Sequence, residues 1–72
     1  MLLNALKLHA EGHIAKHKAN VLVYMKHPAG IGDHPDIIDS MEKEILEIAK
    51  YQDVIDMINM HFSNEEQLPL FS

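Results

Sequence analysis

Apolar residues recur at alternating steps of three and four along both halves of the chain, which is the spacing of one face of an α-helix. The first half predicts a helix over about residues 2–26, and the second half predicts another over about residues 35–62. Each stripe continues for about seven helical turns. The first stripe consists of Leu3, Leu6, Ala10, Ile14, His17, Val21 and Tyr24, and the second of Ile37 or Ile38, Met41, Ile45, Ile48, Gln52, Ile55, Ile58 and Phe62.

The segment KHPAGIGDHP between the two stripes predicts a turn. A proline pushes the residue before it out of the helical region, and a glycine adopts positive φ at little cost. For the second helix we expect Asp33 or His34 as the N-cap and Pro35 near the first helical position. On the surface of that helix, Asp39–Lys43 and Lys43–Glu47 are spaced to form ion pairs. Two helices of equal length with a short loop predict an all-α fold, an antiparallel two-helix hairpin.

One hairpin offers too little core for a chain of 72 residues that has no cysteine and therefore no disulfide. Domains of this size usually need a disulfide, a metal or a partner chain. We therefore predict that the hairpin dimerises into a four-helix bundle with two-fold symmetry, with a higher oligomer as the alternative. An isolated hairpin would leave several further apolar residues in water: Leu8, Leu22, Leu46, Val54, Met57 and Met60.

A strip of small residues lies beside the first stripe and allows close approach of another helix. An isolated glycine in a helix costs about 1 kcal/mol relative to alanine, so we interpret Gly12 as a residue kept for packing. Leu8, Ala15 and Leu22 widen the apolar face next to it. The small residues are Ala5, Gly12 and Ala19, at steps of seven.

The charge distribution excludes some classes of partner. The net charge is −5 and every basic residue is lysine, which argues against direct binding of nucleic acid. The lysines concentrate in the first half and the acids in the second, so the two helices attract each other weakly. We interpret the carboxylates of the second helix as a solvated face. We expect neither a signal peptide nor a membrane span, and we expect a cytoplasmic protein.

Six histidines are the main candidates for chemistry. His9, His13 and His17 share a helix face at steps of four, and adjacent pairs suit a transition metal. No carboxylate stands at Glu-x-x-His spacing, so we favour structural or interface roles over a metal site, with a pH-sensitive dimer as a further alternative. We expect Met57 and Met60 to fill an interface rather than bind copper. No nucleophile–base pair or phosphate loop is present, so we expect no enzyme, no catalytic residue and no cofactor.

The segment QLPLF is set apart from the helical domain of residues 1–62, within a flexible tail of residues 63–72. It resembles the pentapeptide by which bacterial replication and repair proteins dock on the DNA sliding clamp. The resemblance implies that Gln67 enters a polar pocket and that Leu68, Leu70 and Phe71 fill an apolar cleft. Pro69 departs from the usual residue at the variable position, and it stiffens the peptide. The alternative is that these apolar side chains cap the open end of the protein's own bundle.

Residues 10–62, with AEGHIAKHKAN and GIGDHPDI as the densest match, resemble short uncharacterised proteins of T4-type cyanophages and other marine phages. That resemblance implies no activity; it implies a phage origin and action in the cytoplasm of an infected bacterial cell. We expect a non-enzymatic accessory protein, a homodimeric helical bundle with a peptide that docks on a sliding clamp. The alternatives are a purely structural or assembly protein and a histidine-rich metal-binding bundle.

Overall fold

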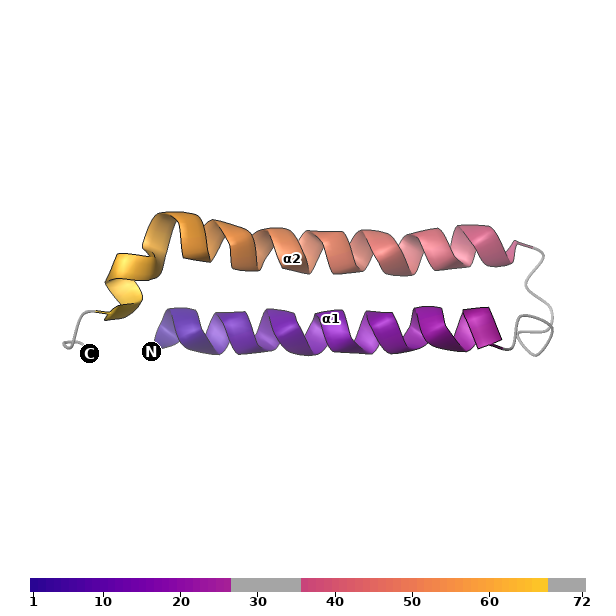
Figure 1. Ribbon diagram of the computed structural model, residues 1–72, viewed down its shortest axis with the longest axis horizontal. Coiled ribbons are helices and arrows are strands. Elements are labelled where there is room, and N and C mark those ends of the chain that lie inside the picture. Colours follow the sequence, from indigo (N-terminus) through magenta and orange to yellow (C-terminus); the bar gives the residue numbers. More distant parts are fainter. Residues whose placement is uncertain (27–35, 68–72) are drawn as a thin grey trace.

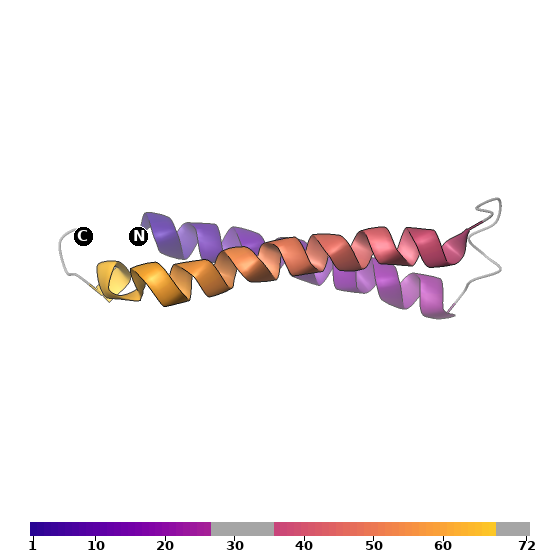
Figure 2. The same ribbon diagram turned by 90° about the horizontal axis from the view of Figure 1, so that it is seen from above.

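The computed structural model describes residues 1–26 and 36–67, with side chains as far as Ser63. It contains two helices, α1 (Leu2–Lys26) and α2 (Ile37–Gln67), and no strand in these ranges. The helices lie side by side and antiparallel in a rod with extents of 52, 15 and 14 Å (Figures 1 and 2). The prediction of an all-α two-helix hairpin is therefore confirmed, and dimerisation stays a prediction. Neither helix, over the described residues, is long and apolar enough to cross a membrane.

The start of α2 is fixed by Asp36 rather than by Asp33 or His34, so the predicted N-cap is wrong. The Asp36 side chain accepts a hydrogen bond from the backbone N–H of Asp39 at 2.8 Å, and its carbonyl accepts one from the N–H of Ser40 at 3.2 Å. An aspartate in this position satisfies a backbone donor that the first turn leaves free. The helix consequently begins at Ile37. The linker, including Pro35, lies outside the described residues.

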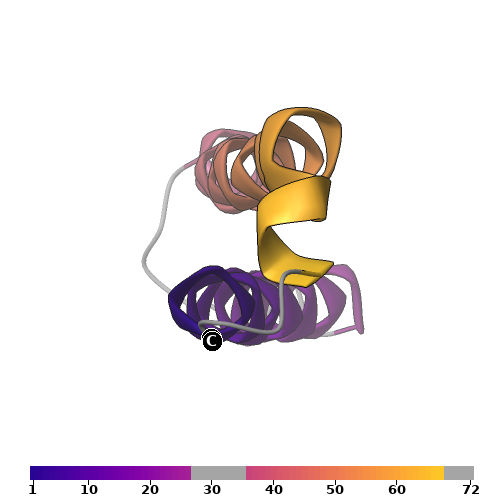
Figure 3. The ribbon, with the colours of Figure 1, turned by 90° about the vertical axis from the view of Figure 1, so that its left-hand side faces the viewer.

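The end of α2 also differs from the prediction. The helix continues to Gln67 instead of ending at Phe62. Loss of the apolar stripe after Phe62 does not break a helix, because glutamate and glutamine are good helix formers in water. Pro69 sets the outer limit, since the residue before a proline disfavours helical angles. Figure 3 shows the yellow final turns of α2 leaving the line of the helix and bending toward α1.

The contact between the helices is narrower and more polar than the predicted stripes. Only Ala10, Ile55 and Ile58 are buried apolar residues among those described, with exposed fractions of 0%, 9% and 4%. Leu6, Ile45 and Phe62 are 44%, 51% and 47% exposed and Gln52 is also exposed, so their predicted places in the helix contact are wrong. At the levels of Ile45 and Gln52, the half-buried neighbours Glu44 and Tyr51 make the contact instead. The apolar pattern alone selects Ile45 for the contact. The coiled-coil repeat of 3.5 residues instead turns its neighbour Glu44 toward α1.

The hairpin leaves large apolar side chains exposed on both helices. A Cβ added at Gly12 would meet nothing within 4 Å, so the packing predicted for Gly12 does not occur within the hairpin. The more exposed of these apolar residues include Leu8, Leu22, Met25, Ile38, Leu46 and Met60.

Candidate functional site

The histidines at steps of four, here called the histidine ladder (His9, His13 and His17), face α2 and meet Tyr51. The His13 ring stacks on the Tyr51 ring at 4.3 Å between centroids and 8° between planes. His9 packs edge-on against His13 at 4.5 Å, and His17 lies 6.4 Å from Tyr51. α1 aligns the three imidazoles because residues four apart lie one above another on a helix. One tyrosine of α2 therefore contacts all levels of the ladder.

At the His17 end of the histidine ladder, a carboxylate of α2 binds the imidazole. Nδ1 of the buried His17 lies 2.7 Å from Oε1 of Glu44, and Asn20 Nδ2 donates a hydrogen bond to the same oxygen at 2.9 Å. The hydrogen bond from His17 is the largest cause that lowers the pKa of Glu44 below its ordinary value of 4.5, and the one from Asn20 adds to it. Glu44 is thus an anchored group, and the interpretation of all α2 carboxylates as a solvated face is wrong for this residue.

A second carboxylate connects the ladder to the protein surface. Glu47 Oε1 lies 4.0 Å from His17 Nε2 and 3.0 Å from the ammonium of Lys50. The hydrogen bond to Glu47, and then the negative charge of Glu47, raise the pKa of Lys50. The Lys50 ammonium also lies over the Tyr51 ring, 4.8 Å from its centroid. The ammonium of Lys50 therefore makes a cation–π contact with Tyr51. The predicted surface pair Asp39–Lys43 forms at 3.4 Å, whereas Glu47 pairs with Lys50 instead of the predicted Lys43.

His13 is the least satisfied member of the ladder. Its Nδ1 is buried and has no hydrogen-bond partner in the described part of the chain. Burial is the main cause that lowers the pKa of His13 from its ordinary value of 6.5. Positive charge on neighbouring side chains lowers this pKa further; these neighbours are His9, Lys16, His17 and Lys50. The neutral imidazole is therefore the form that the folded hairpin favours at this position.

The histidine ladder is not joined by a full set of metal-ligating side chains in the part of the chain that the structure describes. No group of three or more histidine, cysteine, aspartate or glutamate side chains in residues 1–26 and 36–67 is placed to hold a metal ion. The His13 and His17 rings stack 6.2 Å apart at 20°, and His17 Nδ1 already bonds Glu44. This geometry favours the structural interpretation of His9, His13 and His17. Glu44 and Tyr51 complete the cluster. The signal in the sequence that could have found them is their spacing of seven residues, which places both on the side of α2 that faces the histidines.

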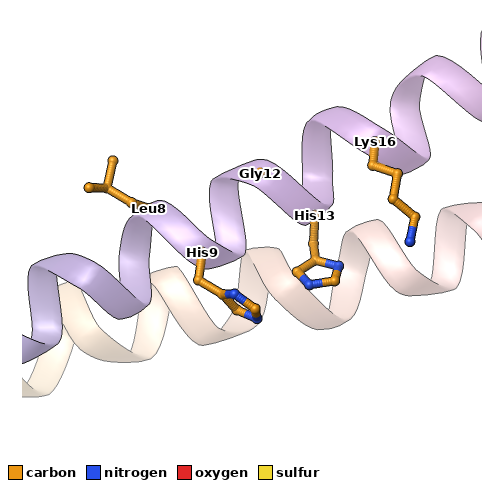
Figure 4. A pocket seen from close by; sticks show the side chains of 5 residues that line it. All are labelled: Leu8, His9, Gly12, His13 and Lys16. Carbon is orange, nitrogen blue, oxygen red and sulfur yellow. The ribbon is translucent and has the colours of Figure 1, made fainter.

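Two shallow grooves flank the helices, and neither encloses a ligand. One of about 290 Å³ lies along α1, where Figure 4 shows His9 and His13 pointing toward α2 and Leu8 pointing away. The other, of about 210 Å³, is apolar and lies between the helices. Ligand sites usually surround most of their ligand, so these grooves suit a packed helix better than a small molecule. The residues lining the second groove are Lys18, Val21, Leu22, Ile45 and Ile48.

The predicted docking peptide lies at the edge of what the structure describes. Gln67 is the last residue of α2, and Leu68, Leu70 and Phe71 lie outside the described residues, so the peptide stays a prediction. Comparisons with protein-family models, with curated proteins and with solved structures find no match for this chain.

Proposed function

We propose that this chain is a non-enzymatic interaction protein: a helical hairpin that associates with a second copy into a four-helix assembly and presents a C-terminal docking peptide. The observation that carries this proposal is the exposure of large apolar side chains on both helices, among them Leu8 at 60% and Met60 at 67%. A single chain of this size has little core of its own. An interface with a second chain would remove these side chains from water.

The docking peptide is assigned by its composition and spacing. Gln67 offers an amide to a polar pocket, and Leu68, Leu70 and Phe71 offer three large apolar groups within four residues. The partner proposed for it is the sliding clamp of a bacterium or phage, with action in an infected bacterial cell. A dimer carries two such peptides, and a ring-shaped clamp repeats its sites. Where both peptides reach sites at once, the apparent affinity rises by about 10²–10⁴.

The test compares the binding of full-length protein to an immobilised bacterial clamp before and after Phe71→Ala. Burial of a phenylalanine contributes about 1.5–3 kcal/mol, so the substitution weakens binding by about 10-fold to 100-fold. Phe62→Ala is the matched control, because Phe62 is an exposed phenylalanine on α2 outside the peptide. Equal affinity of the wild type and Phe71→Ala would exclude docking through this peptide.

One observation favours a second candidate, an assembly protein that closes its own bundle with the tail. The final turns of α2, which precede the peptide in the sequence, bend toward α1 (Figure 3). In that case the wild type has no affinity for the clamp, and Phe71→Ala lowers the melting temperature instead. Thermal unfolding of the same two variants therefore separates the candidates.

A further inference from the structure

α1 carries a second helical stripe without a charged residue, and this stripe lies mostly on the side away from α2. At its end, Leu22 also lines the groove that Ile45 and Ile48 of α2 share. The members of the stripe follow one another at alternating steps of three and four, the spacing that packs against one partner helix. Ala5, Gly12 and Ala19 each come two residues after a residue of the contact with α2. Two residues correspond to a rotation of about 200° around the helix axis. All members are exposed in the hairpin. This stripe, called the outer seam, consists of Ala5, Leu8, Gly12, Ala15, Ala19 and Leu22.

The corresponding side of α2 has the opposite character. Its outward residues include several exposed carboxylates, which favour water over a packed interface. Ala49 is a small residue among them. The hairpin therefore has one apolar and one acidic outer face, and only that of α1 suits an apolar contact. The exposed acids of α2 include Asp39, Glu42, Asp53 and Asp56.

We propose that the outer seam is the surface on which a second copy of this chain docks, with the two α1 helices antiparallel about a two-fold axis. This inference rests on the self-association proposed above and names its surface. The occupant follows from size complementarity. When the seam meets itself antiparallel over its whole length, Leu8 lies opposite Ala19 of the partner subunit. By the same symmetry, Leu22 lies opposite Ala5 of the partner subunit.

At the centre of this pairing Gly12 lies opposite Ala15 of the partner subunit, so the helices approach at the short end of the usual range of about 8–10 Å. The open space beside Gly12 in the hairpin supplies room for that approach. A parallel pairing would set leucine against leucine and glycine against glycine, and would leave gaps at the small layers. Packing without gaps is what stabilises a helix interface.

Charge favours the same direction. Glu11 and Lys18 flank the outer seam on one side, one heptad apart, and both are exposed. In the antiparallel pairing, Glu11 of one chain lies beside Lys18 of the other, and symmetry forms this contact twice. Surface pairs of this kind add only about 0–1 kcal/mol each, so they select the orientation while the apolar seam provides the stability.

The experiment introduces a lysine on the seam and a matched lysine elsewhere. Ala15→Lys and Ala49→Lys each replace an exposed mid-helix alanine, the first on the outer seam and the second on the acidic face of α2. We expect the wild type and Ala49→Lys to sediment as dimers. We expect Ala15→Lys to dissociate with a Kd raised at least tenfold, because its charge is buried in the interface. Circular dichroism checks that each variant keeps its helices.

Dimerisation of Ala15→Lys with unchanged affinity would overturn the outer seam alone. A wild type that stays monomeric at every concentration would overturn self-association itself, and with it the seam.

The direction of pairing is tested by engineered disulfides, because the chain has no cysteine of its own. A double variant, Leu8→Cys with Ala19→Cys, cross-links two antiparallel copies. Within one helix these positions lie roughly 16 Å apart and cannot join. Cross-linking by either single variant would show parallel pairing and refute the proposal.

Discussion

Glu44 provides the sharpest test of the hairpin's interior, because its carboxylate receives two donors from the other helix. Glu44→Ala removes the acceptor of His17 at 2.7 Å and of Asn20 at 2.9 Å. The imidazole nitrogen of His17 is then left without its partner inside the helix contact, where His17 is 9% exposed. Loss of one partner of a buried polar pair costs about 1–3 kcal/mol. We expect a loss of about 2 kcal/mol in the free energy of unfolding.

The assay is thermal or denaturant unfolding at one fixed protein concentration, because the proposed self-association would make the melting temperature depend on concentration. A loss of about 2 kcal/mol lowers the melting temperature of a domain this small by roughly 8–16 °C. Glu42→Ala is the matched control, because it removes an exposed glutamate two residues away on the same helix. If the two variants unfold within about 0.5 kcal/mol of each other, Glu44 does not anchor the ladder.

Acid should act on the same group. The pKa of Glu44 is lowered in the folded state, so the unfolded chain binds a proton more readily than the folded one. The stabilisation is therefore present above the ordinary pKa of 4.5 and is lost as pH falls through the lower folded value. Glu44→Gln abolishes this part of the acid sensitivity. A wild type and a Glu44→Gln variant that lose stability equally between pH 5 and pH 3 would contradict the assignment.

Two further predictions concern the rest of the helix contact. Burial lowers the pKa of His13 below 6.5, so its protonation destabilises the hairpin as pH falls through that range. His13→Phe, which retains a ring to stack on Tyr51, should make the free energy of unfolding less pH-dependent between pH 7.5 and pH 5.5. An unchanged pH dependence would show that His13 is not the sensitive group. Ile58 is 4% exposed and Ile45 is 51% exposed. In urea unfolding, Ile58→Ala should therefore lower the free energy of unfolding by about 2–5 kcal/mol, and Ile45→Ala by less than about 1 kcal/mol. The reverse order would show that Ile45 belongs to the helix contact, as the apolar pattern predicted.

The existence and extent of α1 were predictable because its contact residues are mostly apolar and regularly spaced. Ala10, Ile14, Val21 and Tyr24 all lie on the buried or half-buried side, as the period predicts. The ion pair between Asp39 and Lys43 was equally predictable, since it depends only on spacing along one helix. Local rules therefore sufficed for this pair and for the contact residues that follow the apolar pattern.

The levels at Glu44 and Tyr51 were not predictable by the same rules. Ile45 and Gln52 fit an apolar stripe of period 3.6, but a long pair of helices keeps a repeat of 3.5, and the small difference accumulates along α2. Whether a glutamate faces the partner helix also depends on which donors that helix offers at the same level. His17 and Asn20 provide them only after the two helices have been aligned, and the sequence of α2 alone does not contain that alignment.

The polar interior and the apolar exterior are two parts of one physical argument. A helix contact made only of isoleucine and alanine would be nearly as stable after one helix had shifted by seven residues along the other. A heptad slip would place His17 opposite Tyr51 or Ile37 and would leave the Glu44 carboxylate without donors. A polar pair within a helix contact therefore fixes register at a cost in stability. In this hairpin that contact buries only three apolar side chains among the described residues. In the proposed dimer, the outer seam of α1 would supply the apolar stabilisation that this narrow contact lacks.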